Sequence, residues 1–89
     1  MQTLKNRTKT LVDVRTPQEY AQHHAPEAIN IPLDQVANRL PEFTKMQKPI
    51  VAYCRSGNRS AMAVQILKQN GISDVYNGGA LEEIMVQLV

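Results

Sequence analysis

Cysteine is nearly absent from this sequence of 89 residues, in which Cys54 is the single one. One thiol excludes an internal disulfide, a Cys-x-x-Cys redox pair and a zinc site built from several cysteines. Tryptophan is absent, and phenylalanine occurs once. Cys54 is therefore a buried filler, a reactive nucleophile or the partner in an intermolecular bond. The residues next to it in the chain are the evidence that distinguishes these roles.

A strong charge imbalance and a long apolar run are missing as well. The formal net charge is +2, which gives no argument for a nucleic-acid partner, because such binders usually present a clustered basic face. The longest apolar run, 50–54, is far shorter than the roughly 20 residues that cross a membrane. The basic first ten residues lack an apolar core and are not an intact signal peptide. We expect a cytoplasmic protein or, alternatively, a periplasmic chain from which a signal peptide has been removed.

The residues that are present predict alternating strands and helices. Short β-branched apolar runs indicate strands, and apolar residues spaced three or four apart indicate helices. Strands are expected at 11–14, 28–31, 50–53 and 74–76, and helices at 17–25, 33–40, 60–70 and 80–88. Such alternation is typical of an α/β layer fold with a mostly parallel sheet. Residues 1–10 are expected to be a flexible segment, and residues 11–89 a single domain.

Local signals set several of these boundaries. Thr16, Pro17 and Glu19 have the pattern of a helix start, with Thr16 as the cap, Pro17 at the first position and Glu19 completing a capping box. Gly71 is expected to end a helix in the left-handed conformation. Three breaks in regular structure are also expected: a helix end at Pro41, a polar linker at 42–49 and a turn at 77–79.

The surroundings of Cys54 favour a reactive thiol. It follows a buried strand, and ligands of open α/β sheets bind beyond the C-terminal ends of strands. The free N–H groups of the next helix and its positive dipole end point toward the same loop. Gly57 lets the backbone turn tightly, and Arg55 and Arg59 add positive charge. Each of these effects stabilises a thiolate, so we expect Cys54 to be a nucleophile in an anion-binding loop.

Plainer interpretations exist for the same residues. Free cysteine is often core filler, but filler has apolar neighbours, whereas the six residues after Cys54 are polar or charged. Arg55 and Arg59 are alternatively solvated surface cations, which is more plausible for Arg55. A cation in the first turn of a helix is unfavourable by itself, so the presence of Arg59 there indicates a nearby anion that pairs with it.

Three ordered motifs resemble the rhodanese domains, a family of thiosulfate and persulfide sulfurtransferases. The family's active-site loop resembles Cys54-Arg55-Ser56-Gly57-Asn58-Arg59-Ser60. Its first strand, with the acidic residue that follows, resembles Leu11–Arg15 with Glu19-Tyr20. Its segment H-I-P-G-A-I-N-I-P-L resembles His24–Leu33. The match runs from Leu11 to Ile84 and is most like the small, single-domain phage-shock protein E type. Two departures are Ala25, in place of the usual aliphatic residue, and Glu27, in place of the usual glycine. A frequent tryptophan near the C-terminus is also missing.

This resemblance implies a rhodanese-like three-layer fold, with a mostly parallel central sheet of four to five short strands flanked by helices. It implies that Cys54 is the catalytic nucleophile, attacks the outer sulfur of thiosulfate and carries it as a persulfide to a thiol or, in the assay, to cyanide. No cofactor and no metal are implied. We expect Arg59→Ala to weaken thiosulfate turnover more than Arg55→Ala. The expected substrate-binding residues are Arg55, Ser56, Gly57, Asn58, Arg59 and Ser60.

Two other functions remain open at this point. A non-catalytic rhodanese-like module would bind a partner, although such modules have usually lost the cysteine. A cysteine phosphatase or an arsenate reductase is less favoured, because those enzymes place five residues between cysteine and arginine, whereas four lie between Cys54 and Arg59.

The remaining candidate residues favour structural roles. His23 and His24 have no thiol or carboxylate partners nearby in the chain, which makes a poor metal site, and by resemblance His24 is a structural hydrogen-bonding residue. Asp13 and Arg15 are expected to tie the end of the first strand to a neighbouring loop. The expected partners are a small-molecule sulfur donor and a thiol or cyanide acceptor, without nucleic acid or membrane. We expect a monomer or a weak homodimer, because the last helix carries several apolar residues.

Overall fold

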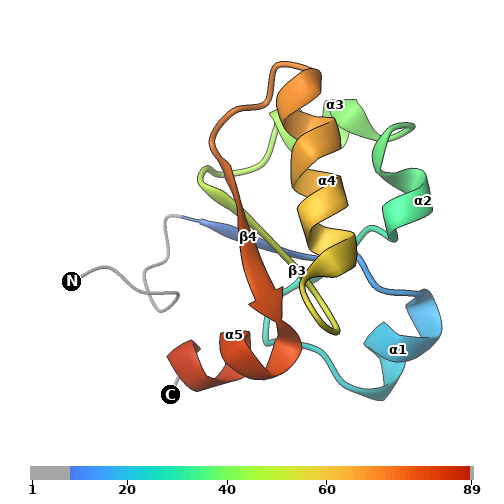
Figure 1. The fold of residues 1–89 in the computed structure, drawn as a ribbon, viewed down its shortest axis with the longest axis vertical. Coiled ribbons are helices and arrows are strands. Elements are labelled where there is room, and N and C mark those ends of the chain that lie inside the picture. The colour runs from blue at the N-terminus through green and yellow to red at the C-terminus, as the bar shows by residue number, and fades with distance from the viewer. Residues whose placement is uncertain (1–8, 89) are drawn as a thin grey trace.

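The computed structural model describes residues 9–88, which form a parallel sheet between two groups of helices (Figure 1). The sheet has the strand order β2-β1-β3-β4, and each neighbouring pair is parallel. This confirms the predicted α/β architecture. In chain order, the elements are β1 (Thr10–Asp13), α1 (Pro17–Gln22), β2 (Ile29–Asn30), α2 (Leu33–Val36), α3 (Leu40–Thr44), β3 (Ile50–Cys54), α4 (Asn58–Gln69), β4 (Val75–Ala80) and α5 (Leu81–Leu88).

The predicted flexible segment 1–10 lies mostly outside the described residues, which begin at residue 9. At its end, Thr10 already belongs to β1 and pairs with Ile50 of β3. The sheet therefore starts one residue before the predicted strand.

Strand β3 divides the apolar core into two halves, because successive side chains of a strand point to opposite faces of the sheet. All five of its residues are buried, as expected for a central strand that is covered on both faces. Ile50, Ala52 and Cys54 belong to one apolar cluster, and Val51 and Tyr53 belong to the other. Cys54 thus shares its face with Ala52 rather than with Tyr53.

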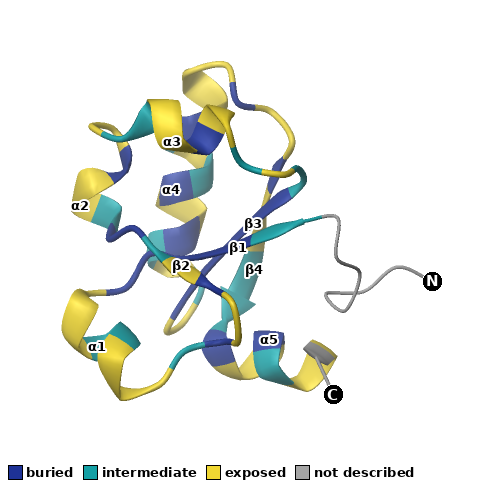
Figure 2. Cartoon of the chain, turned by 180° about the vertical axis from the view of Figure 1, so that it is seen from behind, coloured by how far each residue is buried: buried dark blue, intermediate teal, exposed yellow. Residues whose placement is uncertain are grey.

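Helices cover both faces of the sheet. Helices α2, α3 and α4 lie together on the face of Cys54 and contribute Val36, Phe43 and Leu67 to its cluster (Figure 1). Helix α5 covers the other face, where Leu81 and Ile84 pack on the cluster of Tyr53. Viewed from behind, the central strands β1 and β3 are mostly buried, whereas the helices beside and below them combine buried and exposed positions (Figure 2).

The predicted helix signals at Thr16 and Gly71 are confirmed. The Thr16 side chain accepts a hydrogen bond from the backbone N–H of Glu19, whose carboxylate accepts one from the Thr16 backbone N–H, so the capping box is complete. Gly71 follows α4 with a φ of 88°, which is the left-handed conformation that favours glycine.

Glu27 occupies a backbone conformation that suits glycine better. Its φ is 67°, in the left-handed region where the Cβ atom of an ordinary residue is crowded. This is the position at which the rhodanese pattern usually has glycine. The turn before β2 therefore places a non-glycine residue in the left-handed region.

The prediction of a polar linker after Pro41 is wrong, because the segment overlaps helix α3 (Leu40–Thr44). Pro41 lies in the first turn of that helix, where a missing N–H costs no hydrogen bond, and it does not act as the end of the preceding one. Helix α2 instead ends at Val36. Phe43 of α3 is completely buried, and this burial gives the short helix its tertiary support.

The turn predicted at 77–79 is also wrong, because β4 continues through these residues to Ala80. Asn77 pairs with Ala52, and Gly79 pairs with Tyr53, so the register shifts and leaves Gly78 as the extra residue of a bulge. A Cβ atom at Gly78 would lie 2.7 Å from Val51 Cγ1. Gly78 therefore serves close packing within the sheet rather than a reversal of the chain, whereas a Cβ atom at Gly79, whose φ is 88°, would meet the Glu83 side chain.

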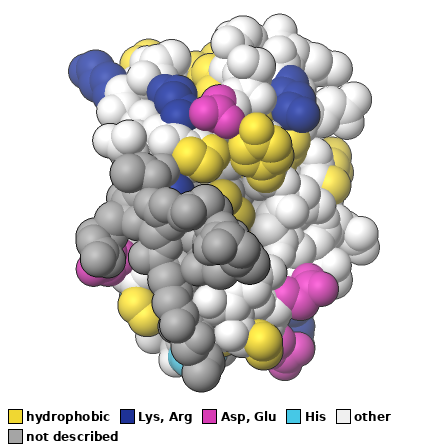
Figure 3. All heavy atoms as spheres, turned by 90° about the vertical axis from the view of Figure 1, so that its left-hand side faces the viewer, with side chains coloured by type: hydrophobic (Ala, Val, Ile, Leu, Met, Phe, Trp, Pro, Cys, Tyr) yellow, Lys and Arg dark blue, Asp and Glu magenta, His cyan; other side chains and the backbone are white. Residues whose placement is uncertain are grey.

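The surface on the β4 side of the molecule mixes hydrophobic side chains with charged ones (Figure 3). The apolar residues of α5 that led us to expect self-association are largely used inside the domain, since Leu81 and Ile84 are buried, while Val86 is exposed.

Within residues 9–88, no helix combines the length and the apolar character needed to span a membrane.

Candidate active site

The carboxyl ends of β1, β3 and β4 meet at one edge of the sheet, because parallel strands end on the same side. Asp13 ends β1, Cys54 ends β3 and Ala80 ends β4. The N-terminus of α4 lies at this edge, because the helix begins at Asn58, four residues after Cys54. The predicted juxtaposition of the thiol with a helix N-terminus is present in the structure.

The sulfur of Cys54 takes the place of a capping side chain at the start of α4. The N-cap residue, Gly57, has a φ of 94° and no side chain with which to cap the helix. The Gly57 N–H lies 3.0 Å from Cys54 Sγ, and the Ser60 N–H lies 3.4 Å from it. The helix begins at Asn58, two residues earlier than predicted, and these amides converge on the sulfur. Sγ thus satisfies donors that would otherwise have no partner in the helix.

Burial and hydrogen bonding act on the Cys54 thiol in opposite directions. Burial raises its pKa, while a hydrogen bond with the Ser60 side chain, in which either atom can be the donor, and hydrogen bonds from the backbone N–H groups of Ser60, Ser56 and Gly57 lower it, and the pKa lies below the ordinary value. Cys54 has no exposed surface. The site is therefore built to favour a negative charge on a sulfur that solvent does not reach in this conformation.

The anion that pairs with Arg59 is a carboxylate of the protein itself. Arg59 Nη1 lies 2.8 Å from Glu19 Oε1, and its Nη2 donates to Glu19 Oε2 at 3.2 Å. Arg55 approaches the same carboxylate at 4.0 Å, but its side chain is 80% exposed. Of the two arginines that the sequence singled out, Arg59 is held in place and Arg55 reaches into solvent.

Glu19 is strongly stabilised as an anion. The hydrogen bond from Arg59, followed by the hydrogen bond from the Thr16 backbone, lowers the pKa of Glu19 from 4.5 to about 2. Its side chain is 21% exposed. One carboxylate of α1 therefore completes the helix cap and also neutralises a cation beside the thiol.

Asp13 and Arg15 form the structural tie that the sequence suggested. Both side chains are buried, and their carboxylate and guanidinium are joined by several hydrogen bonds, including one of 2.7 Å. Arg15 also donates to the backbone carbonyl of His23, which fastens the end of β1 to the loop after α1. His24 stacks on the ring of Tyr20 and contacts its carbonyl at 2.7 Å, in keeping with a structural role.

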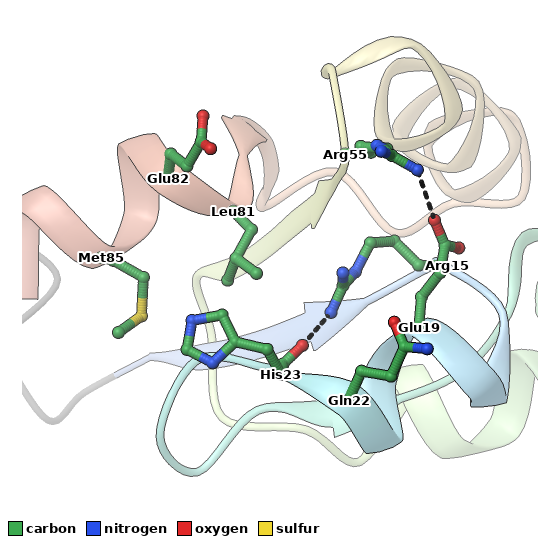
Figure 4. Close-up of a pocket in the computed structure, with 8 residues that line it drawn as sticks. All are labelled: Arg15, Glu19, Gln22, His23, Arg55, Leu81, Glu82 and Met85. Carbon is green, nitrogen blue, oxygen red and sulfur yellow. Dashed lines mark hydrogen bonds and ion pairs between the residues drawn. The ribbon is translucent and has the colours of Figure 1, made fainter.

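A cavity of about 430 Å³ opens beside the loop (Figure 4). Glu19 and the exposed Arg55 lie at one end of this cavity, and the side chains of Leu81 and Met85 from α5 form an apolar wall at the other. The remaining lining residues are Arg15, Gln22, His23 and Glu82. Nowhere in residues 9–88 do three or more His, Cys, Asp or Glu side chains gather in a way that suits a metal ion.

The structure brings some of the predicted loop residues to the sulfur and leaves others in solvent. Gly57 and Ser60 contact Sγ, whereas the side chains of Arg55, Ser56 and Asn58 belong to exposed residues. Arg59 lies nearby but is paired with Glu19.

Two residues at this edge were not predicted as parts of the site. Glu19 was assigned only to a helix cap, and the acidic residue of the family pattern was the signal that pointed further. Asn77 was assigned to a turn, yet its side chain contacts Ser60 Oγ at 2.6 Å and the Gly57 carbonyl at 3.0 Å. No pattern within the sequence marks Asn77 as a partner of the loop.

Comparison with known proteins agrees with this geometry. A family model described as the rhodanese-like domain matches residues 1–82. The chain is 38% identical to the thiosulfate sulfurtransferase PspE of Escherichia coli, over 88% of this chain and 76% of that protein. It is 36% identical to the thiosulfate sulfurtransferase GlpE of Pseudomonas syringae, over 85% of this chain and 71% of that one.

Solved structures give the same result. A rhodanese from Escherichia coli, solved with anions, superposes with a TM-score of 0.78 at 36% identity, over 85% of this chain and 91% of that chain. The matched region includes most of the described residues. The chain therefore belongs to the rhodanese-like sulfurtransferase family.

Proposed function

We propose that this protein transfers a sulfane sulfur from thiosulfate, or from a persulfide, to a thiophilic acceptor through a persulfide on Cys54. The observation that carries the proposal is the position of Cys54 Sγ at the N-terminus of α4, where it accepts hydrogen bonds from the amides of Gly57 and Ser60. The thiosulfate sulfurtransferase activity of the relatives PspE and GlpE supports thiosulfate as a donor.

In the first half-reaction, the Cys54 thiolate attacks the outer sulfur of thiosulfate. A new sulfur–sulfur bond forms on Sγ, the bond between the two sulfurs of thiosulfate breaks, and its electron pair leaves with sulfite. The total charge is unchanged, because thiolate and thiosulfate dianion become persulfide anion and sulfite dianion. No metal and no organic cofactor takes part.

In the second half-reaction, a thiolate acceptor attacks the outer sulfur of the Cys54 persulfide. The sulfur leaves with the acceptor as a new persulfide, and the electron pair of the broken bond restores the Cys54 thiolate. The amides at the start of α4 are positioned before the reaction begins, so their dipoles stabilise negative charge at the sulfur without reorganisation. The apolar wall of the adjoining cavity suits the carbon chain of a small thiol.

Access to Cys54 requires movement at the loop, because the residue has no exposed surface. Within the part of the chain that the structure describes, the Arg55 side chain is held only by its 4.0 Å contact with Glu19, so its displacement costs little. As an exposed cation beside the buried nucleophile, Arg55 is suited to meet the anionic donor first. Arg59 then offsets the negative charge of Glu19 close to the sulfur.

This arrangement predicts unequal effects of removing the two arginines. Arg55→Ala removes one exposed cation. Arg59→Ala removes a cation and also leaves the Glu19 carboxylate with only the exposed Arg55 at 4.0 Å, so that it repels the dianionic donor. We expect kcat/KM for thiosulfate to fall several-fold in Arg55→Ala and more than tenfold in Arg59→Ala. The double variant Glu19→Gln with Arg59→Ala should recover part of the loss, and equal, negligible effects of both single variants would contradict the proposed anion site.

The decisive experiment is intact mass spectrometry after incubation with thiosulfate, followed by removal of the donor. A gain of one sulfur, about 32 Da, with release of an equal amount of sulfite, is the expected result. The control variant Cys54→Ser should show neither. Addition of cyanide should return the mass to its starting value and release thiocyanate.

A negative result has a defined meaning. If neither thiosulfate nor a low-molecular-weight persulfide adds sulfur to the folded wild-type protein, the proposed transfer is wrong. The alternative, a non-catalytic rhodanese-like module, then becomes the better interpretation.

A further inference from the structure

Asn77 links β4 to the cysteine loop through hydrogen bonds that leave its side chain one orientation. Its Oδ1 accepts the backbone N–H of Gly79 at 2.9 Å, and its Nδ2 donates to the carbonyl of Gly57 at 3.0 Å. A backbone N–H can only donate, and a carbonyl can only accept. The two contacts therefore fix which end of the amide faces each partner, and Oδ1 faces Ser60.

This orientation decides the direction of the Ser60 hydroxyl. Ser60 Oγ lies 2.6 Å from Asn77 Oδ1, and since Oδ1 has no hydrogen, the serine must donate. A hydroxyl has one hydrogen to give. Toward Cys54 Sγ, which lies 3.5 Å away, Ser60 Oγ then presents only lone pairs.

The consequence differs between the two protonation states of Cys54. A neutral thiol donates its S–H to Ser60 Oγ and completes a chain that runs from Cys54 through Ser60 to Asn77. A thiolate has no hydrogen to donate, so it can use Ser60 only if the hydroxyl rotates away from Asn77 toward Sγ. The support of the thiolate by the Ser60 hydroxyl is therefore in competition with Asn77.

We propose that Asn77 is a positioning residue that directs the Ser60 hydroxyl away from Cys54 in the resting protein, so that the thiolate gains this hydrogen bond only when the hydroxyl leaves Asn77. Strand β4 lies beside both β3 and α4 (Figure 1), so Asn77 in the bulged segment reaches two residues that contact the sulfur, Ser60 through its hydroxyl and Gly57 through its carbonyl. The inference rests on the proposed function only in taking Cys54 as the nucleophile.

The charged groups around this network are the same in every variant compared below, because none of them is substituted. They come from each element packed against the site: Arg55 of the loop, Arg59 of α4, Glu19 of α1, Asp13 of β1 and Glu83 of α5. Their effect on Cys54 is common to all variants compared below, so it cancels in the comparison.

The test measures the pKa of Cys54 from the pH dependence of its alkylation rate by iodoacetamide, with no sulfur donor present. The result therefore stands whether or not the protein transfers sulfur. Asn77→Ala should lower the pKa of Cys54 by about half a unit to one unit, which is the effect of one hydrogen bond gained by the thiolate. At a pH well below the pKa, alkylation should then be about three to ten times faster.

The same substitution in a Ser60→Ala background separates this mechanism from general support of the loop. If Asn77 acts through the Ser60 hydroxyl, Asn77→Ala should leave the pKa of Cys54 unchanged in that background. A change of equal size in both backgrounds would overturn the proposal, because it would place the effect in the contact with Gly57. If Asn77→Ala left the pKa of Cys54 unchanged in the protein that retains Ser60, that result would also overturn the proposal.

Two further variants guard against loss of folding. Asn77→Asp keeps an oxygen acceptor for Ser60. It should raise the pKa of Cys54 more in the protein that retains Ser60 than in the Ser60→Ala variant. Tyr76→Ala, at an exposed neighbouring position of β4, is the control for disturbance of the strand and should leave the pKa of Cys54 unchanged. Equal increases for Asn77→Asp in the two backgrounds would contradict the proposal independently of Asn77→Ala.

Discussion

Glu19 offers a test of how the site is held together, because one carboxylate serves both a helix cap and the cation beside Cys54. Its replacement by glutamine keeps a side-chain oxygen for the Thr16 backbone N–H, so the capping box survives. What is lost is the negative charge that faces Arg59 at 2.8 Å. Glu19→Gln therefore isolates the electrostatic part of the interaction.

The magnitude follows from the pKa of Glu19, which is lowered from 4.5 to about 2. At about 1.36 kcal/mol per pH unit this gap corresponds to roughly 3.4 kcal/mol. Solvent screens the pair, since the Glu19 side chain is 21% exposed and that of Arg59 is 34% exposed. We therefore expect the charge to contribute about 1–2 kcal/mol to the free energy of unfolding at neutral pH.

The pH dependence has a definite direction. A carboxyl group whose pKa is lower in the folded state stabilises the protein above its unfolded pKa, and this contribution is lost as the pH falls toward the folded pKa. About 60% of it should be gone at pH 3. The difference in free energy of unfolding between wild type and Glu19→Gln should thus shrink by about 1 kcal/mol between pH 7 and pH 3.

Urea unfolding followed by far-ultraviolet circular dichroism is the appropriate assay, because the sequence has no tryptophan to report by fluorescence. Glu42→Gln is the matched control, since Glu42 pairs with Arg39 at the surface and should show a much smaller dependence on pH. A difference between wild type and Glu19→Gln that is the same at both pH values would refute the reasoning.

Two predictions concern stability away from the loop. Phe43→Ala should lower the free energy of unfolding by about 3–5 kcal/mol, because Phe43 is completely buried between α3 and the sheet and its loss leaves a cavity; a loss below about 1 kcal/mol in urea unfolding would show that α3 is not part of the core. Glu27→Gly should raise the melting temperature by a few degrees, because the left-handed conformation at Glu27 costs about 1–2 kcal/mol for an ordinary residue and less for glycine. An unchanged or lower melting temperature would mean that Glu27 makes compensating contacts.

Much of the architecture was predictable because its signals are local. The five apolar residues of β3 could be covered only by helices on both faces, and the capping box at Thr16 needs three neighbouring residues. The errors arose where local signals were ambiguous. Pro41 ends some helices and begins others, and the choice here depends on burial of Phe43, which lies two residues further along the chain.

The glycines of β4 show the same limit. Asn-Gly-Gly is a strong turn signal by itself, yet Gly78 fits against Val51 of β3 in a way that a larger residue could not. Pairing with a strand more than twenty residues away overrode the local preference. The sequence alone had no information on that register.

By itself, the sequence determined that a lone thiol ends a buried strand, that a helix N-terminus follows it and that the loop between them carries cations, because these facts depend only on neighbouring residues. Only the tertiary structure decided what those groups contact. It joined Arg59 to a carboxylate forty positions earlier in the chain and Ser60 to an amide seventeen positions later. The physical reason is that an ion pair or hydrogen bond requires atoms within about 3 Å, and for residues far apart in the chain only packing of the whole sheet and its helices provides that closeness.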